Sequence, residues 1–168
     1  AERAHEGVYR KGTKIPYITH PMETAAIVTA FTNEPEMIAA ALLHDVIEDA
    51  GVTKEELEEK FGSRVAFLVE SESEDKSRSW MERKGTTVEH LKSATRDEKI
   101  LALADKLSNI RSTVRDYLVL GDEVWQRFNQ KDKEMQGWYY KGVAEALKEF
   151  KGHIYYEEYL MLCKKIFG

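Results

Sequence analysis

Cysteine and proline are scarce in this sequence, and each scarcity restricts what the chain can be. One cysteine, Cys163, occurs among 168 residues, so no disulfide can form within the chain. A single thiol is typical of proteins kept in a reducing compartment, and we therefore expect a cytoplasmic protein. The three prolines are Pro16, Pro21 and Pro35. Because proline interrupts helices, the part of the chain that follows them is able to form long ones.

Long hydrophobic runs and an excess of positive charge are also missing. No apolar stretch approaches the roughly 18 residues that a membrane-spanning helix needs. The formal net charge is -5 and the isoelectric point is about 5.6, whereas proteins that bind nucleic-acid polymers usually present a basic face. We therefore expect neither a nucleic acid nor a membrane as a partner. The chain begins AERAHEG, without the pattern of a secretory signal and without Met, which leaves open whether residues precede Ala1.

The composition is that of a folded globular protein. Hydrophobic residues make up 42% of the chain and charged residues 33%, and its length is close to the roughly 150 residues of one domain. We predict a single domain over residues 1–168. No segment alternates apolar and polar residues for long enough to require a strand, so we predict an all-α fold. The expected helices cover residues 2–9, 21–32, 35–49, 54–61, 63–70, 86–94, 96–119, 131–150 and 153–166.

Capping boxes, in which a Thr is followed three residues later by a Glu, predict where some of these helices begin. The pairs are Thr53 with Glu56, Thr86 with Glu89 and Thr95 with Glu98. Two segments are predicted to be irregular. Residues 10–19 contain Gly, Pro and β-branched residues, and residues 71–79 contain no apolar residue.

The stretch MIAAALLHDVIED, residues 37–49, ends in four ionisable side chains. At 100° per residue, His44, Asp45, Glu48 and Asp49 share one face of a helix. Buried carboxylates without partners are costly, and a divalent cation with phosphate oxygens beyond it would remove that cost. An exposed acidic helix end is the alternative that the pattern leaves open.

The segment ILALADKLSNIRST, residues 100–113, places polar side chains on one stripe of an apolar helix. Asp105 lies inside the helix, and Asn109 and Ser112 follow it at helical spacing. Asp is unfavourable in a helix interior, which indicates a role beyond local structure. An Asp that pairs with a nearby basic side chain is the alternative.

The segment RKGTKIPYITHP, residues 10–21, combines a histidine with concentrated positive charge. His20 stands just before Pro21 and a predicted helix start, and Arg10, Lys11 and Lys14 precede it. Guanidinium and ammonium groups on a loop suit the recognition of phosphate. A solvated basic loop is the alternative.

Taken together, the three segments supply a mixed nitrogen and oxygen ligand set. Its members are His20, His44, Asp45 and Asp105. Such a set suits Mn²⁺, Fe²⁺ or Zn²⁺ better than Ca²⁺, and it does not choose among the three.

These segments resemble the HD-domain metal-dependent phosphohydrolases, whose signature is H…HD…D. They are similar in particular to the hydrolase domain of the RelA/SpoT enzymes, which degrade the alarmone ppGpp, and to its single-domain form, the small alarmone hydrolases. The resemblance runs from about His5 to Ser112. It implies an all-α HD-domain helical bundle that removes pyrophosphate from the 3′ position of (p)ppGpp and leaves GDP or GTP.

The resemblance also implies a role for each candidate residue. His20, His44, Asp45 and Asp105 would bind one Mn²⁺, and Glu48 and Asp49 would orient or deprotonate the attacking water. Arg10 and Lys11 would hold the nucleotide and its phosphates, and Asn109 and Ser112 would line the nucleoside pocket.

Two departures from the family pattern bear on the substrate. The chain reads ESESEDKSRSW after FGSRVAFLV, and the loop from Arg10 to His20 differs in length from that of the long enzymes. The nucleotide ppApp and the 2′-phosphate of NADPH are therefore alternative substrates. A module that binds a nucleotide without hydrolysing it is a third interpretation, against which the Glu48–Asp49 pair counts. The sequence does not indicate the oligomeric state.

Overall fold

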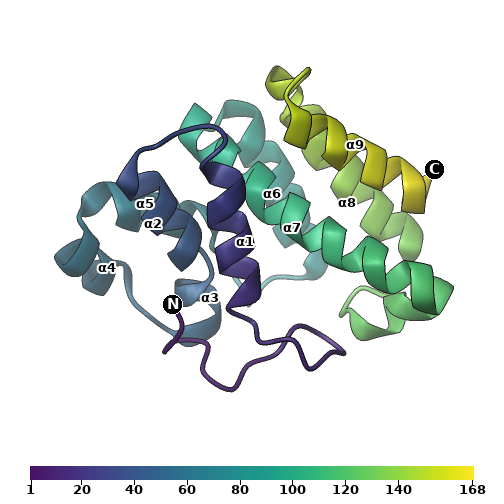
Figure 1. Cartoon of the computed structure of the whole chain (residues 1–168), viewed down its shortest axis with the longest axis horizontal. Coiled ribbons are helices and arrows are strands. Elements are labelled where there is room, and N and C mark those ends of the chain that lie inside the picture. Colours follow the sequence, from purple (N-terminus) through teal and green to yellow (C-terminus); the bar gives the residue numbers. More distant parts are fainter. The chain divides into compact units, whose positions relative to one another are not determined.

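The computed structural model describes residues 1–168, and its regular elements are helices (Figure 1). An isolated bridge between Tyr9 and Pro16 is the single pairing of β type, so the predicted all-α fold is confirmed. The α-helices are α1 (Thr19–Val28), α2 (Pro35–Leu43), α3 (Val46–Ala50), α4 (Lys54–Phe61), α5 (Ser63–Glu72), α6 (Trp80–Ser93), α7 (Arg96–Leu120), α8 (Lys133–Ala146) and α9 (Ile154–Phe167), and the 3-10 helices are η1 (Gly121–Arg127) and η2 (Lys148–Phe150). None of the helices combines the length and the apolar character that crossing a membrane requires.

The chain divides into two compact units that share α7. The first unit comprises Ala1–Glu74 with Thr95–Asp105, and the second comprises Asp75–Ala94 with Lys106–Gly168. The division falls inside α7, between Asp105 and Lys106. The single domain over residues 1–168 stays a prediction.

Helix α2 is central to the first unit, because it packs against both α1 and α5, while α4 packs against α5. It begins with Pro35, which suits the first turn of a helix since that turn leaves its N–H groups without intrahelical partners. Ala40 and Ala41 are fully buried, and their small side chains allow neighbouring helices to approach closely. The larger buried side chains of this unit are Ile27, Val28, Met37, Leu57, Leu68, Leu101 and Leu103.

An ion-pair cluster joins the start of α7 to the rest of the first unit. The guanidinium of Arg64 on α5 reaches Glu34 at 2.5 Å, Glu36 at 3.2 Å and Asp97 at 2.7 Å. Single exposed ion pairs contribute little to stability, but one arginine shared by several carboxylates constrains the register of the helices that carry them. The cluster therefore helps to hold the first turns of α7 against α2 and α5.

The second unit is organised around α8, which packs against α6 and α9. Two glycines of α8 make these contacts close. A side chain at Gly142 would meet Val88 of α6 at 3.1 Å, and one at Gly137 would meet Phe167 of α9 at 3.1 Å. The buried hydroxyl of Tyr159 donates a hydrogen bond to the backbone oxygen of Tyr140 at 3.0 Å. The polar tip of this tyrosine is thus satisfied inside an apolar core.

The structure corrects several predicted helix boundaries. Residues 2–7 form turns instead of the helix predicted at 2–9, and Gly7, at their end, takes a left-handed conformation with φ of 74° that a helix cannot continue through. The helix predicted at 35–49 is interrupted after Leu43 and resumes at Val46. The predictions of 54–61 and 96–119 agree with α4 and α7 to within one residue.

Two of the three predicted capping boxes are confirmed. Thr53 and Glu56 bond reciprocally at the start of α4, and Thr95 and Glu98 do so before α7. The prediction that Thr86 begins a helix at 86–94 is wrong, because α6 already begins after Ser79, which forms its own capping box with Glu82. Trp80 and Met81 follow the segment predicted to be irregular, residues 71–79, and supply apolar residues to the first turn of α6.

The two threonines provide a matched test of this assignment. Replacing Thr53 by Ala should lower the free energy of unfolding by about 1 kcal/mol, because an N-cap bond is lost. The same replacement at Thr86, which is exposed within α6, should change it by less than about 0.5 kcal/mol. Urea unfolding followed by circular dichroism measures both. Equal losses in the two variants would contradict the assignment of the cap.

Candidate metal centre

Four side chains predicted as metal ligands converge in the first unit, from three separate parts of the chain. His20 is in the first turn of α1, His44 caps the C-terminus of α2, Asp45 caps the N-terminus of α3, and Asp105 lies in α7. Figure 1 shows the helices that carry them. His20, His44 and Asp105 are each at most 5% exposed.

The donor atoms of this group lie close together. The Nε2 atoms of His20 and His44 are 3.2 Å apart. Asp45 Oδ2 is 3.5 Å from His20 Nε2 and 3.0 Å from His44 Nε2. Asp105 Oδ1 is 3.0 Å from His20 Nε2 and 3.6 Å from His44 Nε2. Each carboxylate thus faces the same two imidazole nitrogens.

These distances fit the donor atoms of one cation. For ligands about 2.1 Å from a metal, neighbouring donors are about 3.0 Å apart in an octahedron and about 3.4 Å apart in a tetrahedron. The observed separations run from 3.0 to 3.6 Å, close to these values, and the ligand atoms of His20, His44 and Asp105 all lie within 4.8 Å of one another. The donor set of two imidazoles and two carboxylates is also one that divalent transition metals favour.

The backbone sets the orientation of the His44 ring. Its Nδ1 lies 2.8 Å from the carbonyl oxygen of Ala41, which can only accept a hydrogen bond, so Nδ1 carries a proton. In neutral His44 the lone pair is therefore on Nε2, the atom that faces His20 and the carboxylates. A ring nitrogen held in this way by a carbonyl is typical of histidines that bind metals.

Burial and mutual charge shift the pKa values in this group. Burial lowers the pKa of His20, although Asp105 opposes the shift. Burial also acts to lower the pKa of His44, but the carboxylates of Asp45 and Asp105 outweigh it and hold that pKa well above its ordinary value. The charge and hydrogen bond of His44 outweigh burial at Asp45 and hold the pKa of its carboxyl well below the usual range. A cation bound here would replace a proton on His44.

Glu48 and Asp49, the residues predicted to act on water, follow the cluster on α3. Glu48 is half-buried and accepts a long hydrogen bond of 3.4 Å from the backbone N–H of Glu74. Asp49 is exposed, and its N–H donates to the carbonyl of Asp45 at 2.9 Å. The segment that follows α5 therefore touches one of the two predicted acids. The catalytic role of both stays a prediction.

Arg10 and Lys11, predicted to hold phosphate, lie in the loop before α1. A hydrogen bond of 2.9 Å from Arg10 N–H to Ile15 oxygen closes this loop, and Gly12 turns it with φ of 69°. Lys11 is exposed, and the guanidinium of Arg10 lies 5.5 Å from the ring centroid of Tyr17. Both side chains are thus presented on a closed loop of the first unit.

Asn109 and Ser112 lie on α7 one and two turns beyond Asp105, in the second unit. Ser112 accepts a hydrogen bond of 3.2 Å from Arg115. The helical spacing predicted for them is confirmed. Their contact with a nucleoside stays a prediction.

Tyr17 is a functional candidate that the sequence pattern did not identify. Its hydroxyl donates a hydrogen bond of 2.7 Å to Oδ2 of Asp45. Burial and the charge of Asp45 raise the pKa of this phenol well above its ordinary value, so it remains a donor. The two residues are 28 positions apart, and no spacing rule connects them. The only local signal is the position of Tyr17 beside Pro16, close to His20.

The sequence profile of the HD domain matches residues 1–131. The guanosine-3′,5′-bis(diphosphate) 3′-pyrophosphohydrolase MESH1 of Xenopus tropicalis is 35% identical over 155 residues, which cover 90% of this chain and 81% of that protein. The protein of the same name from Danio rerio is 39% identical over 117 residues, and the match spans 68% of this chain and 65% of the relative.

One solved structure is similar to this chain in its fold. It is described as a metazoan ortholog of SpoT that hydrolyzes ppGpp and plays a role in starvation responses. It superimposes with a TM-score of 0.81 at 27% identity, over 98% of this chain and 89% of the other.

Two histidines allow a direct test of the metal centre. His44→Ala should weaken the binding of Mn²⁺ by more than about 100-fold, because even partners of metal ligands contribute about 10- to 100-fold. His90→Ala, at an exposed position of α6, should bind as the wild type does. Isothermal titration calorimetry measures both, and affinity in the wild type should rise with pH, since His44 must lose a proton. Equal affinities of the two variants would rule the site out.

Proposed function

The chain belongs to the HD-domain family, and we propose that it is a metal-dependent 3′-pyrophosphohydrolase of (p)ppGpp. The observation that carries this proposal is the buried cluster of His20, His44 and Asp105, with Oδ2 of Asp45 within 3.5 Å of both imidazole Nε2 atoms. Relatives named as guanosine-3′,5′-bis(diphosphate) 3′-pyrophosphohydrolases share 35% to 39% of the aligned residues. The products would be pyrophosphate and GDP or GTP.

The proposed ligands hold one divalent cation, for which Mn²⁺ is the first choice and Fe²⁺ and Zn²⁺ are alternatives. When bound, such an ion supplies Lewis acidity toward a phosphoryl oxygen and lowers the pKa of water. His44 contributes Nε2, with its ring fixed by Ala41. Asp45 and Asp105 contribute one oxygen each and offset the positive charge. Burial of the ligands strengthens these electrostatic interactions.

The proposed hydrolysis begins with proton transfer to an acidic side chain. Glu48 or Asp49 accepts a proton from the attacking water, whose oxygen forms a bond to the phosphorus attached to the ribose 3′ oxygen. The bond between that phosphorus and the 3′ oxygen breaks, and the 3′ oxygen takes up a proton. Glu48 is the stronger candidate for the base, because its half-buried carboxylate is held by the N–H of Glu74.

The positive side chains of the loop before α1 complete the proposed site. Arg10 and Lys11 offset charge on the pyrophosphoryl group that is transferred to water, as guanidinium and ammonium groups do at phosphates. Asn109 and Ser112 bind the nucleoside part of the substrate. Action in the cytoplasm, which the single cysteine indicates, stays a prediction.

Substrate hydrolysis is the first test. The purified chain incubated with ppGpp and Mn²⁺ should release pyrophosphate, detected by ³¹P NMR, and EDTA should abolish the release. Parallel reactions with ppApp and NADPH at equal enzyme concentration measure the base and phosphate preference. Turnover of one of these with intact ppGpp would replace the substrate but keep the metal-dependent reaction. Tight binding of ppGpp without product would instead identify a sensing module.

The acid pair is tested separately from the metal. Glu48→Gln should lower kcat by about 100- to 10,000-fold, the range typical of general base catalysis, while the affinity for Mn²⁺ changes by less than a few-fold. Glu58→Gln, at an exposed position of α4, serves as the control for loss of one negative charge. Full activity of Glu48→Gln would leave Asp49 as the base. A comparable loss in Glu58→Gln would show a general effect of charge.

A further inference from the structure

We propose that Tyr17 is a positioning residue that couples the phosphate-binding loop to the metal centre through its contacts with Asp45 and Arg10. The inference rests on the proposed function, because it assigns Tyr17 a role toward the same cation and the same substrate. Tyr17 itself is not a proposed metal ligand. It acts through the residues that are.

The hydroxyl of Tyr17 determines how Asp45 presents its carboxylate. The oxygen that accepts its hydrogen bond at 2.7 Å is Oδ2, the same atom that faces the two histidines. A carboxylate at a helix N-cap can rotate, and Asp45 makes no capping bond with its side chain. The phenol therefore supplies an orienting contact. Hydrogen bonds of this kind from outer residues typically raise metal affinity about 10- to 100-fold.

The ring of Tyr17 is packed from several directions by groups of the same unit. Its centroid lies 4.8 Å from that of His5, with the planes inclined by 24°, and 5.8 Å from that of His20 at 77°. The guanidinium of Arg10 lies 5.5 Å from the same centroid, a distance at which a cation and an aromatic face attract. The ring is thus the common contact of a metal ligand and a phosphate-binding candidate.

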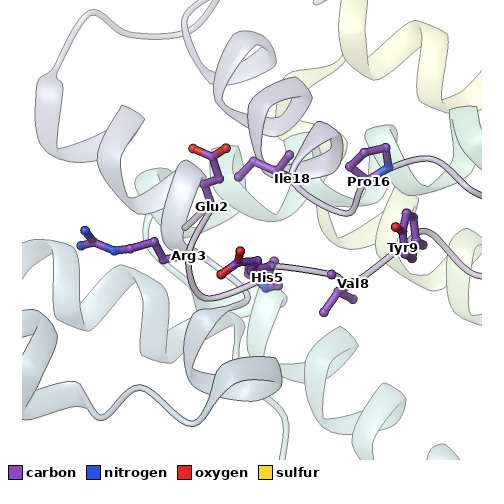
Figure 2. Close-up of a pocket in the computed structure, with 9 residues that line it drawn as sticks. Glu2, Arg3, His5, Val8, Tyr9, Pro16 and Ile18 are labelled. Atoms are coloured by element: carbon purple, nitrogen blue, oxygen red, sulfur yellow. The ribbon is translucent and has the colours of Figure 1, made fainter.

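The backbone of Tyr17 also holds the loop. Its N–H donates to the carbonyl of Val8 at 2.9 Å, next to the bridge between Tyr9 and Pro16. A pocket of about 380 Å³ lies beside this segment (Figure 2). His5, Tyr9 and Pro16 line that pocket. The stacking of His5 on Tyr17 is one of the contacts that connect the N-terminal segment to the residues just before α1.

Burial of His5 agrees with this anchoring role. The side chain is 4% exposed, and its Nδ1 donates to the carbonyl of Ala1 at 3.0 Å. Its Nε2 is buried without a hydrogen-bond partner, which costs stability. The stacking on Tyr17 is a favourable contact that offsets part of this cost.

The two functions of the side chain can be separated by two substitutions. Tyr17→Phe removes the hydroxyl but keeps the ring, so it should weaken Mn²⁺ binding by about 10-fold or more and leave KM for ppGpp unchanged at saturating metal. Excess Mn²⁺ should then restore its kcat. Tyr17→Leu removes the ring as well and should also raise KM for ppGpp, because the guanidinium of Arg10 loses its contact with the aromatic ring.

Tyr9→Phe is the matched control, since Tyr9 is 56% exposed in the same segment. It should equal the wild type in metal affinity, KM and urea midpoint. Calorimetry with Mn²⁺ alone gives the affinities independently of turnover. Wild-type affinity in Tyr17→Phe overturns the inference, and so does a lowered urea midpoint with unchanged affinity, which indicates a purely structural role. A wild type that binds no divalent cation overturns the proposed metal centre itself, and with it this inference.

Discussion

The approach of two carboxylates to two imidazole nitrogens inside the first unit is the constraint on which the rest of the structure depends. Asp45 and Asp105 each come within 3.0 Å of one of these nitrogens. Charged groups this close and this poorly hydrated are costly unless a proton or a cation compensates them. The raised pKa of His44 and the lowered pKa of Asp45 are the response of the protein alone. A divalent cation provides the same compensation and makes the cluster chemically useful.

The fold satisfies this constraint by combining rigid helices with one interruption. His20 and Asp105 are on α1 and α7, where packing limits their movement. His44 and Asp45 occupy the two residues between α2 and α3. Both residues keep right-handed helical backbone angles, and Nε2 of His44 lies 3.0 Å from Oδ2 of Asp45. The substrate-binding candidates Arg10 and Lys11 are on a loop instead. Tyr17 contacts both Arg10 of that loop and Asp45 of the metal centre.

Much of the molecule could be predicted from local patterns. The boundaries of α4 and α7 follow from capping boxes and from apolar periodicity, both of which act within a few residues. The helix predicted at 2–9 is wrong, since residues 2–7 form turns that end at Gly7 in a left-handed conformation, which glycine adopts at little cost. The prediction that α6 starts at residue 86 is wrong, because its capping box at Ser79 lies at the end of a polar run, residues 71–79, whose composition indicates irregular structure. At the interruption of the helix predicted at 35–49, His44 and Asp45 contact His20, which is distant in sequence, and no local pattern indicates such contacts.

By itself, the sequence determined the helical class, the identity of the candidate ligands and the chemistry that such ligands favour, because residue type and helical spacing are local properties. Only the tertiary structure decided that the imidazoles of His20 and His44 lie 3.0 to 3.6 Å from the carboxylates of Asp45 and Asp105. It also revealed Tyr17 beside Asp45. The physical reason is that such contacts depend on the packing of helices and loops, and every residue in the core influences that packing.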